Sequence, residues 1–210
     1  PTGTVFVDGQ DITSFPLENL REQVGYVPQD AFLFSESLRA NVSLSQPDAS
    51  EEAVLAALAG AQLSKDLDQL PEGLDTIIGE RGVNLSGGQR QRTALARVLL
   101  FAPKLLILDD TLSAVDTNTA ESILEYLRPF AAGRTTILIA HRLSSLSHAE
   151  QIIVLENGKI VERGTHAQLL ALGGHYSSTW ELQQESEDNA VRASQLEQEL
   201  EQGFEDGAEQ

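Results

Sequence analysis

The sequence feature that most restricts the fold is an apolar run, Leu105 to Leu108, that ends abruptly in two carboxylates, Asp109 and Asp110. A continuous apolar run of this length predicts a parallel strand that is covered on both faces. Shortly before it, Ser86 and two glycines precede a run of residues that suits a long helix, with Ser86 as a plausible N-cap. A strand that ends in two carboxylates and a helix that begins with a serine and two glycines together point to a nucleotide-binding site.

Local signals place further strands and helices on either side of this pair. Strand-like patterns cover residues 4–8, 24–27, 135–140, 151–156 and 159–163, and helical patterns cover residues 16–22, 53–61, 87–100, 119–127 and 166–172. The apolar run at residues 135–140 predicts another buried strand. Asp48 to Glu51 and Thr165 to Gln168 resemble capping boxes, and Asn157-Gly158 predicts a tight hairpin turn. Strands that alternate with helices indicate a doubly wound α/β layer.

The helix start at Ser86-Gly87-Gly88 is a candidate anion site. Unpaired amide donors and the positive end of the helix both favour phosphate, and glycine lets a ligand approach the backbone closely. The plainer alternative is an ordinary serine N-cap with a flexible entry. Because the chain has no G-x-x-x-x-G-K-[ST] phosphate loop, the sequence predicts only part of a nucleotide site.

Four polar side chains follow predicted strands directly: Gln29, Asp109, Asp110 and His141. The carboxyl ends of parallel strands form the edge of the sheet where ligands gather, and a carboxylate there can hold Mg²⁺ directly or through water. Taken singly, the two acids can instead cap the next helix, and the histidine and glutamine can be ordinary loop residues. Their meeting at one edge favours a ligand site.

Composition narrows the class of protein. The apolar share of 41% supplies a core, the absence of cysteine excludes disulfides, and the net charge of −18 argues against a nucleic-acid partner. The absence of methionine, even at position 1, leads us to expect a piece of a longer polypeptide. Residues 181–210 hold ten acids and one arginine, and Leu196 and Leu200 are too few to hold a coiled coil, so we expect disorder or a frayed helix there.

The motifs, in their order and spacing, resemble the nucleotide-binding domains of ABC transporters. The corresponding segments are the Q-loop at Tyr26 to Gln29, the signature at Leu85 to Gln89, Walker B at Leu105 to Asp109, the D-loop at Ser113 to Asp116 and the switch histidine at His141. Two segments resemble the corresponding segments of ABC exporters rather than those of importers. They are Thr76 to Gly82, which includes Glu80 and Arg81, and His141 to Ser144. The resemblance runs from about Pro1 to Trp180.

This resemblance implies an α/β fold of the P-loop type, in which helices flank a mixed or parallel sheet and an α-helical signature subdomain is inserted. Residues 1–180 would be a partial nucleotide-binding domain, with the helical subdomain at about 31–100, and residues 181–210 an acidic C-terminal extension. The Walker A portion and a transmembrane domain are expected before Pro1. The resemblance further implies ATP and Mg²⁺ as cofactors, and an exporter at the cytoplasmic face of the inner membrane that couples ATP hydrolysis to efflux.

The resemblance also implies a role for each motif residue. Asp109 and Gln29 would hold Mg²⁺, Asp110 would take the place of the general base, and His141 would contact the γ-phosphate. In this family two domains stack head to tail, so each signature closes on the ATP of the other domain. The residues expected at ATP or at the dimer interface are Gln29, Ser86, Gly87, Gly88, Gln89, Ser113 and Asp116.

Asp110 departs from the family pattern, which has glutamate at this position. Aspartate is one methylene shorter, so its carboxylate retreats by about 1.5 Å. A weakened base with an intact signature is the pattern of one subunit of a heterodimeric multidrug-type exporter, and the expected partner is a second ABC half-transporter subunit. The alternatives are a homodimeric exporter subunit that tolerates aspartate and a soluble ABC ATPase outside transport. Without Walker A, this chain alone is expected to be inactive.

The stretch from Ala31 to Phe34 follows Gln29 and carries two aromatic residues. It is a candidate groove for a coupling helix of the transmembrane domain. Packing in the core is the alternative, because aromatic side chains are usually buried.

Overall fold

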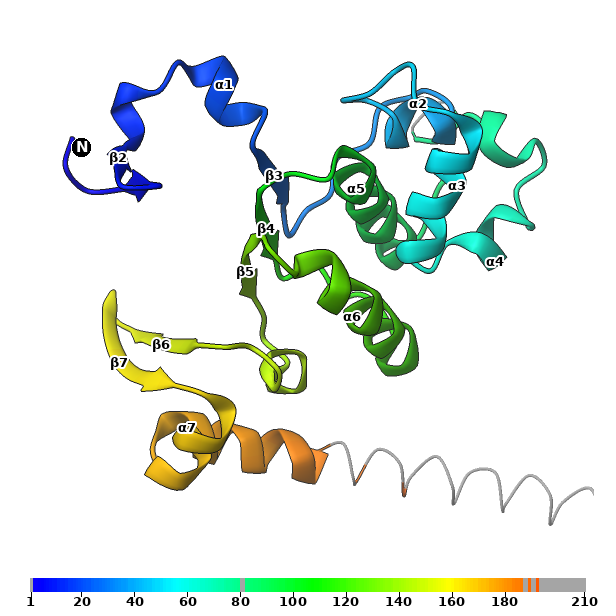
Figure 1. The fold of residues 1–210 in the computed structure, drawn as a ribbon. Helices are drawn as coiled ribbons and strands as arrows, with labels where there is room; N and C mark the ends of the chain where they lie inside the picture. The colour runs from blue at the N-terminus through cyan, green and yellow to red at the C-terminus, as the bar shows by residue number, and fades with distance from the viewer. Residues whose placement is uncertain (1, 80–81, 187–188, 190–191, 193–210) are drawn as a thin grey trace, which may run out of the picture. The chain divides into compact units, whose positions relative to one another are not determined.

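The computed structural model describes residues 2–79, 82–186, 189 and 192 (Figure 1). The chain consists of two compact units, residues 1–141 and residues 142–210. All motif residues of the candidate site lie in the first unit. Glu80 and Arg81 of the exporter-like segment lie outside the described residues, as do Leu196 and Leu200.

A three-stranded parallel sheet forms the centre of the first unit, in the order β3 (Val24–Val27), β4 (Leu105–Asp109) and β5 (Thr135–Ile139). The three strands confirm the sequence prediction to within a residue. On the central strand β4, Leu106 and Leu108 are fully buried, because both neighbours and the helices cover them.

The prediction that β5 is a buried strand is wrong for the described chain. Its side chains are mostly exposed, with Ile137 at 46% and Ile139 at 48%. The strand lies at one edge of the sheet and pairs only with β4 among the described residues. The apolar pattern predicted the strand correctly but did not reveal that its side chains are exposed.

The residues before the sheet form small local elements. β1 (Phe6–Val7) and β2 (Gln10–Asp11) make a short antiparallel hairpin. Of the strand predicted for residues 4–8, only Phe6 and Val7 are in β1. A 3₁₀ turn, η1 (Ile12–Ser14), and a short helix, α1 (Leu17–Arg21), follow. The helix confirms the prediction for residues 16–22, with Pro16 at its N-cap.

A helical group lies between β3 and β4: α2 (Leu38–Val42), α3 (Glu51–Gly60), α4 (Ser64–Leu67), the 3₁₀ turn η2 (Gly73–Asp75) and α5 (Gly87–Phe101). α5 packs against α2, α3 and β3 and supplies fully buried core residues such as Leu95 and Ala96. The N-cap of α3 is Ser50, whose Oγ accepts from Ala53 N at 3.2 Å, so the predicted capping box from Asp48 is wrong. Glu51 and Glu52 then occupy the first turn, where the helix dipole favours acids.

The helix α6 (Thr117–Ala131) follows the D-loop segment and is longer than the predicted 119–127. Asp116 starts it, because its carboxylate accepts from Thr119 N at 3.0 Å. Pro129 stands in the last turn without ending the helix earlier. The prediction stopped short at both ends because it followed only the apolar periodicity.

The second unit contains a 3₁₀ turn, η3 (Leu143–Leu146), the antiparallel hairpin of β6 (Ile152–Glu156) and β7 (Lys159–Gly164), and the helix α7 (His166–Leu172). Asn157 and Gly158 both have positive φ, at 50° and 74°, which confirms the predicted tight turn. The predicted capping box of Thr165 and Gln168 is also confirmed. Residues 175–186 are helical. No helix of the described residues is long and apolar enough to cross a membrane.

The buried side chain of Asn41 on α2 holds the loop that contains Phe34. Its Oδ1 accepts from Phe34 N at 2.8 Å, and its Nδ2 donates to the carbonyls of Phe34 at 3.0 Å and Ser37 at 3.1 Å. Arg97 of α5 donates to the Asn41 carbonyl at 2.8 Å. One amide therefore ties this loop and α2 together, and the backbone beside it is tied to α5.

Replacing Asn41 by alanine should leave these buried loop groups unpaired, because Asn41 is only 1% exposed. We expect Asn41→Ala to lower the free energy of unfolding by about 2–3 kcal/mol. Thermal unfolding of the full-length polypeptide would measure the change. Asn118→Ala makes the same chemical change at an exposed site on α6 and should leave the melting temperature nearly unaltered. Equal melting temperatures for the two variants would contradict the prediction.

Candidate nucleotide-binding site

Two of the polar residues at the carboxyl ends of the strands, Gln29 and His141, approach the carboxylate of a third, Asp110. Gln29, just after β3, donates from Nε2 to Asp110 Oδ2 at 3.3 Å. His141, just after β5, places its Nε2 at 3.9 Å from the same oxygen. The structure therefore brings together side chains that are far apart in the sequence, at the edge where the sequence placed them.

Asp110 has an unusual backbone conformation. Its φ of 47° lies in the left-handed region, which aspartate tolerates better than most residues. Its N–H donates to the Ile139 carbonyl at 2.8 Å, which ties the end of β4 to the end of β5. The side chain is nearly buried, so the carboxylate is held toward Gln29 and His141 rather than free in solvent.

The neighbouring Asp109 ends β4 and accepts a hydrogen bond at 3.1 Å from Tyr26 Oη on β3. This bond raises the pKa of Tyr26, because deprotonation would place two negative oxygens side by side. Oδ1 of Asp109 and Oε1 of Gln29 accept no hydrogen bond from any described residue. These hard oxygen atoms fit Mg²⁺, which proteins usually bind through one or two carboxylates together with phosphate oxygens and water.

The N-terminus of α5 forms a complete capping box. Ser86 Oγ accepts from Gln89 N at 3.2 Å, and Gln89 Oε1 accepts from Ser86 N at 2.8 Å. The N–H groups of Gly87 and Gly88 donate to no described residue, as expected for the first turn of a helix. Two amides and a serine hydroxyl at the positive end of a 15-residue helix make a site suited to an anion.

The start of α5 lies against the loop between β4 and α6. A Cβ atom on Gly88 would come within 2.6 Å of the Ala114 carbonyl oxygen, so only glycine fits this contact. At Gly87 the nearest atom would be 3.7 Å away, an ordinary contact. Ser113, in the same loop, donates from Oγ to the Asp110 carbonyl at 2.9 Å. The signature glycines and the D-loop thus form one packed unit.

Gln91 is a site residue that the sequence reasoning missed. Its Nε2 donates to the Gln29 carbonyl at 3.2 Å, and its Oε1 accepts from Ala114 N at 3.2 Å. One buried amide therefore connects the signature helix to the Q-loop and to the D-loop. The available signal was its place on the buried face of the helix, four residues before Leu95, where a polar residue needs a partner.

Asp116 lies at the far end of the D-loop segment. The backbone N–H of Thr119 and the Thr119 side chain lower its pKa, and the charge of Arg92 adds to the effect. Its carboxylate therefore stays ionised well below neutral pH. In the described chain its observed role is to start α6, and its expected role across a dimer interface remains a prediction.

The chain shows clear similarity to proteins of one family. A family profile described as "ABC transporter" matches residues 1–113, more than half of the chain. The chain belongs to the ABC transporter family. Its α/β fold is that of an ABC nucleotide-binding domain, because it matches a solved structure of a bacterial Atm1-family ABC exporter with ATP bound, at a TM-score of 0.79 and 42% identity. That match covers 85% of this chain and 31% of the exporter.

Curated ABC relatives agree with this assignment. An uncharacterized ABC transporter ATP-binding protein of Bacillus subtilis, YknU, is 48% identical over 181 residues, which is 86% of this chain and 31% of the relative. A probable multidrug resistance ABC transporter ATP-binding/permease protein of the same organism, YheI, is 47% identical over 182 residues, 87% of this chain and 31% of that protein. The chain thus spans about a third of the length of these relatives.

The contact between Gly88 and Ala114 predicts different tolerances at the two signature glycines. Gly88→Ala should force the helix away from the D-loop and lower the free energy of unfolding by about 1–3 kcal/mol. Gly87→Ala, the matched control, meets no close atom and should leave stability within about 0.5 kcal/mol. Thermal unfolding of both variants of the full-length protein provides the comparison. A Gly87→Ala variant as unstable as Gly88→Ala would show that the packing argument is wrong.

Proposed function

We propose that this chain is part of the ATP-binding domain of an ABC exporter and that its α5 N-terminus closes on ATP held mainly by a partner subunit. The observation that carries the proposal is the arrangement at Ser86, Gly87 and Gly88, where two unengaged amides and a hydroxyl meet the positive end of the helix. The family assignment supports it, and the Atm1-family relative was solved with ATP bound. We call the Ser86 hydroxyl and the N–H groups of Gly87 and Gly88 the phosphate cup. The γ-phosphate is the group of ATP that it would bind.

The second part of the proposal concerns the site at the carboxyl ends of β3, β4 and β5, which would act on this subunit's own ATP. Asp109 and Gln29 would hold Mg²⁺ through carboxylate and amide oxygens. The ion, when bound, supplies positive charge at the β- and γ-phosphates. Asp110 would orient the attacking water and accept its proton, and His141 would donate to the γ-phosphate from Nε2. Gln29, through its contact with Asp110, would transmit changes from the coupling region to the water.

Asp110 is proposed to make this own site a poor hydrolytic site. General-base help contributes about 10²–10⁴ in rate, and the shorter side chain reaches the water less well. The Gln29 contact at 3.3 Å further occupies one oxygen of the carboxylate. The partner's site, completed by the intact signature of this chain, would carry most of the hydrolysis. This division favours a heterodimer with a second ABC half-transporter subunit.

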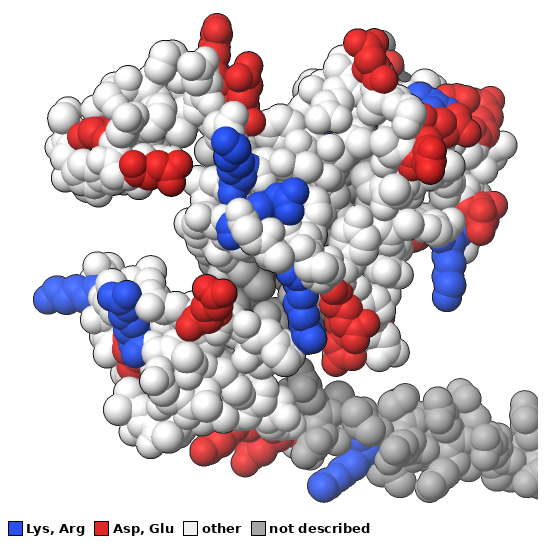
Figure 2. Space-filling model, viewed as in Figure 1, with Lys and Arg blue, Asp and Glu red and all other residues white. Residues whose placement is uncertain are grey.

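The exposed aromatics after the Q-loop support a transporter. Phe32 is 65% exposed and Phe34 is 43% exposed, and their rings meet edge to face with centroids 5.0 Å apart. Such a pair fits a coupling helix of a transmembrane domain, proposed to lie upstream in the same polypeptide, which would place this domain on the cytoplasmic face of the membrane. Acidic side chains gather over the α2–α4 region in the upper right of Figure 2, which argues against a nucleic-acid function.

The two alternatives, a homodimeric exporter subunit and a soluble ABC ATPase, predict different properties of the full-length protein. A homodimeric exporter subunit would hydrolyse ATP without any second gene product. A soluble ABC ATPase would have no membrane-spanning segments in the full-length protein. Purification of the full-length protein, alone and with its genomic neighbour, followed by ATPase assay in lipid vesicles, separates both from the heterodimer.

Removing the Ser86 hydroxyl should impair the partner's site rather than this subunit's own. We expect Ser86→Ala to slow hydrolysis at the partner's site by about 10-fold or more, because a hydrogen bond to a charged group contributes about 1.5–3 kcal/mol. Single-turnover hydrolysis, with one site silenced at a time, would measure each rate. Ser122→Ala, which removes a half-buried hydroxyl that donates to the Asn118 carbonyl within α6, is the matched control. Equal damage at both sites would contradict the head-to-tail arrangement.

Lengthening Asp110 should restore hydrolysis at this subunit's own site. Asp110→Glu returns the carboxylate to the reach of the attacking water, so own-site turnover should rise by about 10-fold or more. Glutamate tolerates the positive φ of this position less well than aspartate, which should reduce the gain slightly. The rate is read in a transporter whose partner site is silenced. Asp68→Glu, at the exposed end of α4, should change nothing. Unchanged turnover in Asp110→Glu would count against a degenerate site.

A further inference from the structure

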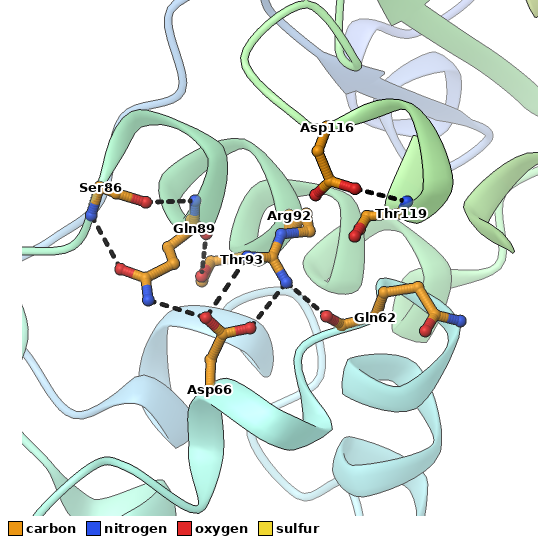
Figure 3. Close-up of polar contacts among 8 residues, drawn as sticks. All are labelled: Gln62, Asp66, Ser86, Gln89, Arg92, Thr93, Asp116 and Thr119. Carbon is orange, nitrogen blue, oxygen red and sulfur yellow. Dashed lines mark hydrogen bonds and ion pairs between the residues drawn. The ribbon is translucent and has the colours of Figure 1, made fainter. Parts of the chain in front are cut away.

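The side chain of Gln89 is turned into its own domain. Its Oε1 accepts from Ser86 N at 2.8 Å, and its Nε2 donates to Asp66 Oδ1 on α4 at 2.8 Å (Figure 3). Both ends of the amide are therefore engaged inside the chain. A Gln89 held in this way does not reach outward to a nucleotide.

Asp66 and the Ser86 N–H together determine which way round this amide lies. An ionised carboxylate only accepts hydrogen bonds, so it selects the NH₂ end of Gln89 and leaves the oxygen end for Ser86 N. The Ser86 N–H is a donor and selects the same orientation, so the two contacts hold the amide from both ends. The capping box at the start of α5 therefore depends on a residue 20 positions before Ser86.

Arg92 holds Asp66 in place and neutralises its charge. Arg92 Nη1 lies 2.7 Å from Asp66 Oδ2, and Nη2 lies 3.4 Å from Oδ1. Nη1 also donates to the Gln62 carbonyl. The two side chains are only 14% and 21% exposed, so water screens the pair less than an ordinary surface ion pair. A bare carboxylate this close to the phosphate cup would repel an anion, and the guanidinium removes that penalty.

The environment keeps Asp66 in its ionised form. Burial is the largest single influence and by itself raises the pKa of Asp66, but the hydrogen bonds from Arg92 and Gln89 and the charge of Arg92 outweigh it. The net pKa lies below the ordinary value of 3.8. At neutral pH the carboxylate is thus an acceptor only, as the orientation of Gln89 requires.

We propose that Asp66 is a positioning residue of the signature: it fixes the Gln89 amide so that Gln89 completes the cap of α5, and Ser86, Gly87 and Gly88 alone face the phosphate. This assignment replaces the expectation that Gln89 itself contacts ATP. It rests on the proposed closure of the α5 N-terminus on a partner's ATP. Asp66 acts through Gln89 and Ser86 and touches no substrate.

The first test is Asp66→Asn in the full-length transporter with its partner subunit. The substitution keeps the shape but removes the charge and leaves a single acceptor oxygen, for which Gln89 Nε2 and Arg92 compete, so the Gln89 amide is held less firmly. We expect hydrolysis at the partner's site to fall by about 5-fold or more, with the rate at this subunit's own site unchanged. Asp68→Asn, the same change at an exposed position two residues on, should alter neither rate. A loss shared equally by both sites, which a purely structural role would produce, would overturn the proposal.

A polarity swap gives a sharper test. Gln89→Glu alone sets two carboxylates against each other and should impair the partner's site strongly. Combined with Asp66→Asn it provides a donor at position 66 and an acceptor at position 89, which restores both contacts without changing the net charge. We expect the double variant to be faster than either single variant. Additive losses in the double variant would overturn the proposal.

Ser86→Ala in the same assay separates this inference from the proposed function. If Ser86→Ala slows the partner's site and Asp66→Asn does not, Asp66 does not position the signature, although the cup still binds phosphate. If neither variant changes the rate, the proposed closure on the partner's ATP fails and the role of Asp66 fails with it. Thermal unfolding of each variant shows whether the compared samples are equally folded.

Discussion

The contact between α5 and the central sheet is the constraint on which the candidate site depends. One helix carries apolar residues that fill the core, Gln91 in its first turns, and the amides of the signature at its N-terminus. Because Gln91 bonds to the carbonyl of Gln29 and to the amide of Ala114, any shift of the helix moves the Q-loop and the D-loop with it. The glycine at position 88 allows this close approach and fixes its distance.

Electrostatics organises the two halves of the site in opposite ways. Around Asp110, the Gln29 amide donates to a nearly buried carboxylate and the His141 ring lies beside it, so a negative group is held at the edge of the sheet. At the start of α5 the helix offers unengaged N–H groups, and the carboxylate of Asp66, which accepts from Gln89, is paired with Arg92. One half suits a metal ion and water, and the other suits phosphate oxygens. This division is what head-to-tail pairing of two such domains would require.

The sequence predicted the parts of the fold that depend on local chemistry. The acid-tipped strand, the Ser86 cap, the turn at Asn157-Gly158 and the Thr165 cap follow from neighbouring residues, and each is present. The exposure of β5 was not predictable, because it depends on which segments lie beside the strand. The start of α3 was misplaced for a smaller reason: Asp48 and Ser50 are both good caps, and packing selects between them.

The site was predictable as a set of motif positions but not as a set of contacts. Gln29, Asp110 and His141 stood out because each lies just past the end of a strand, whereas Asp66, Gln91 and Arg92 resemble ordinary helix residues in the sequence. Their importance arises only when α4, α5 and the D-loop are folded together. No local pattern indicates that the acid on α4 faces the amide of Gln89.

The exposed edge of β5 has a consequence for handling the isolated polypeptide. Among the described residues its outer backbone groups pair with no strand, and Ile137 and Ile139 stand open to solvent. Such an edge is a template for any extended segment that meets it, including another copy of itself. Produced on its own, the polypeptide should tend to self-associate or precipitate through this edge, and its solubility would report how far the edge is covered.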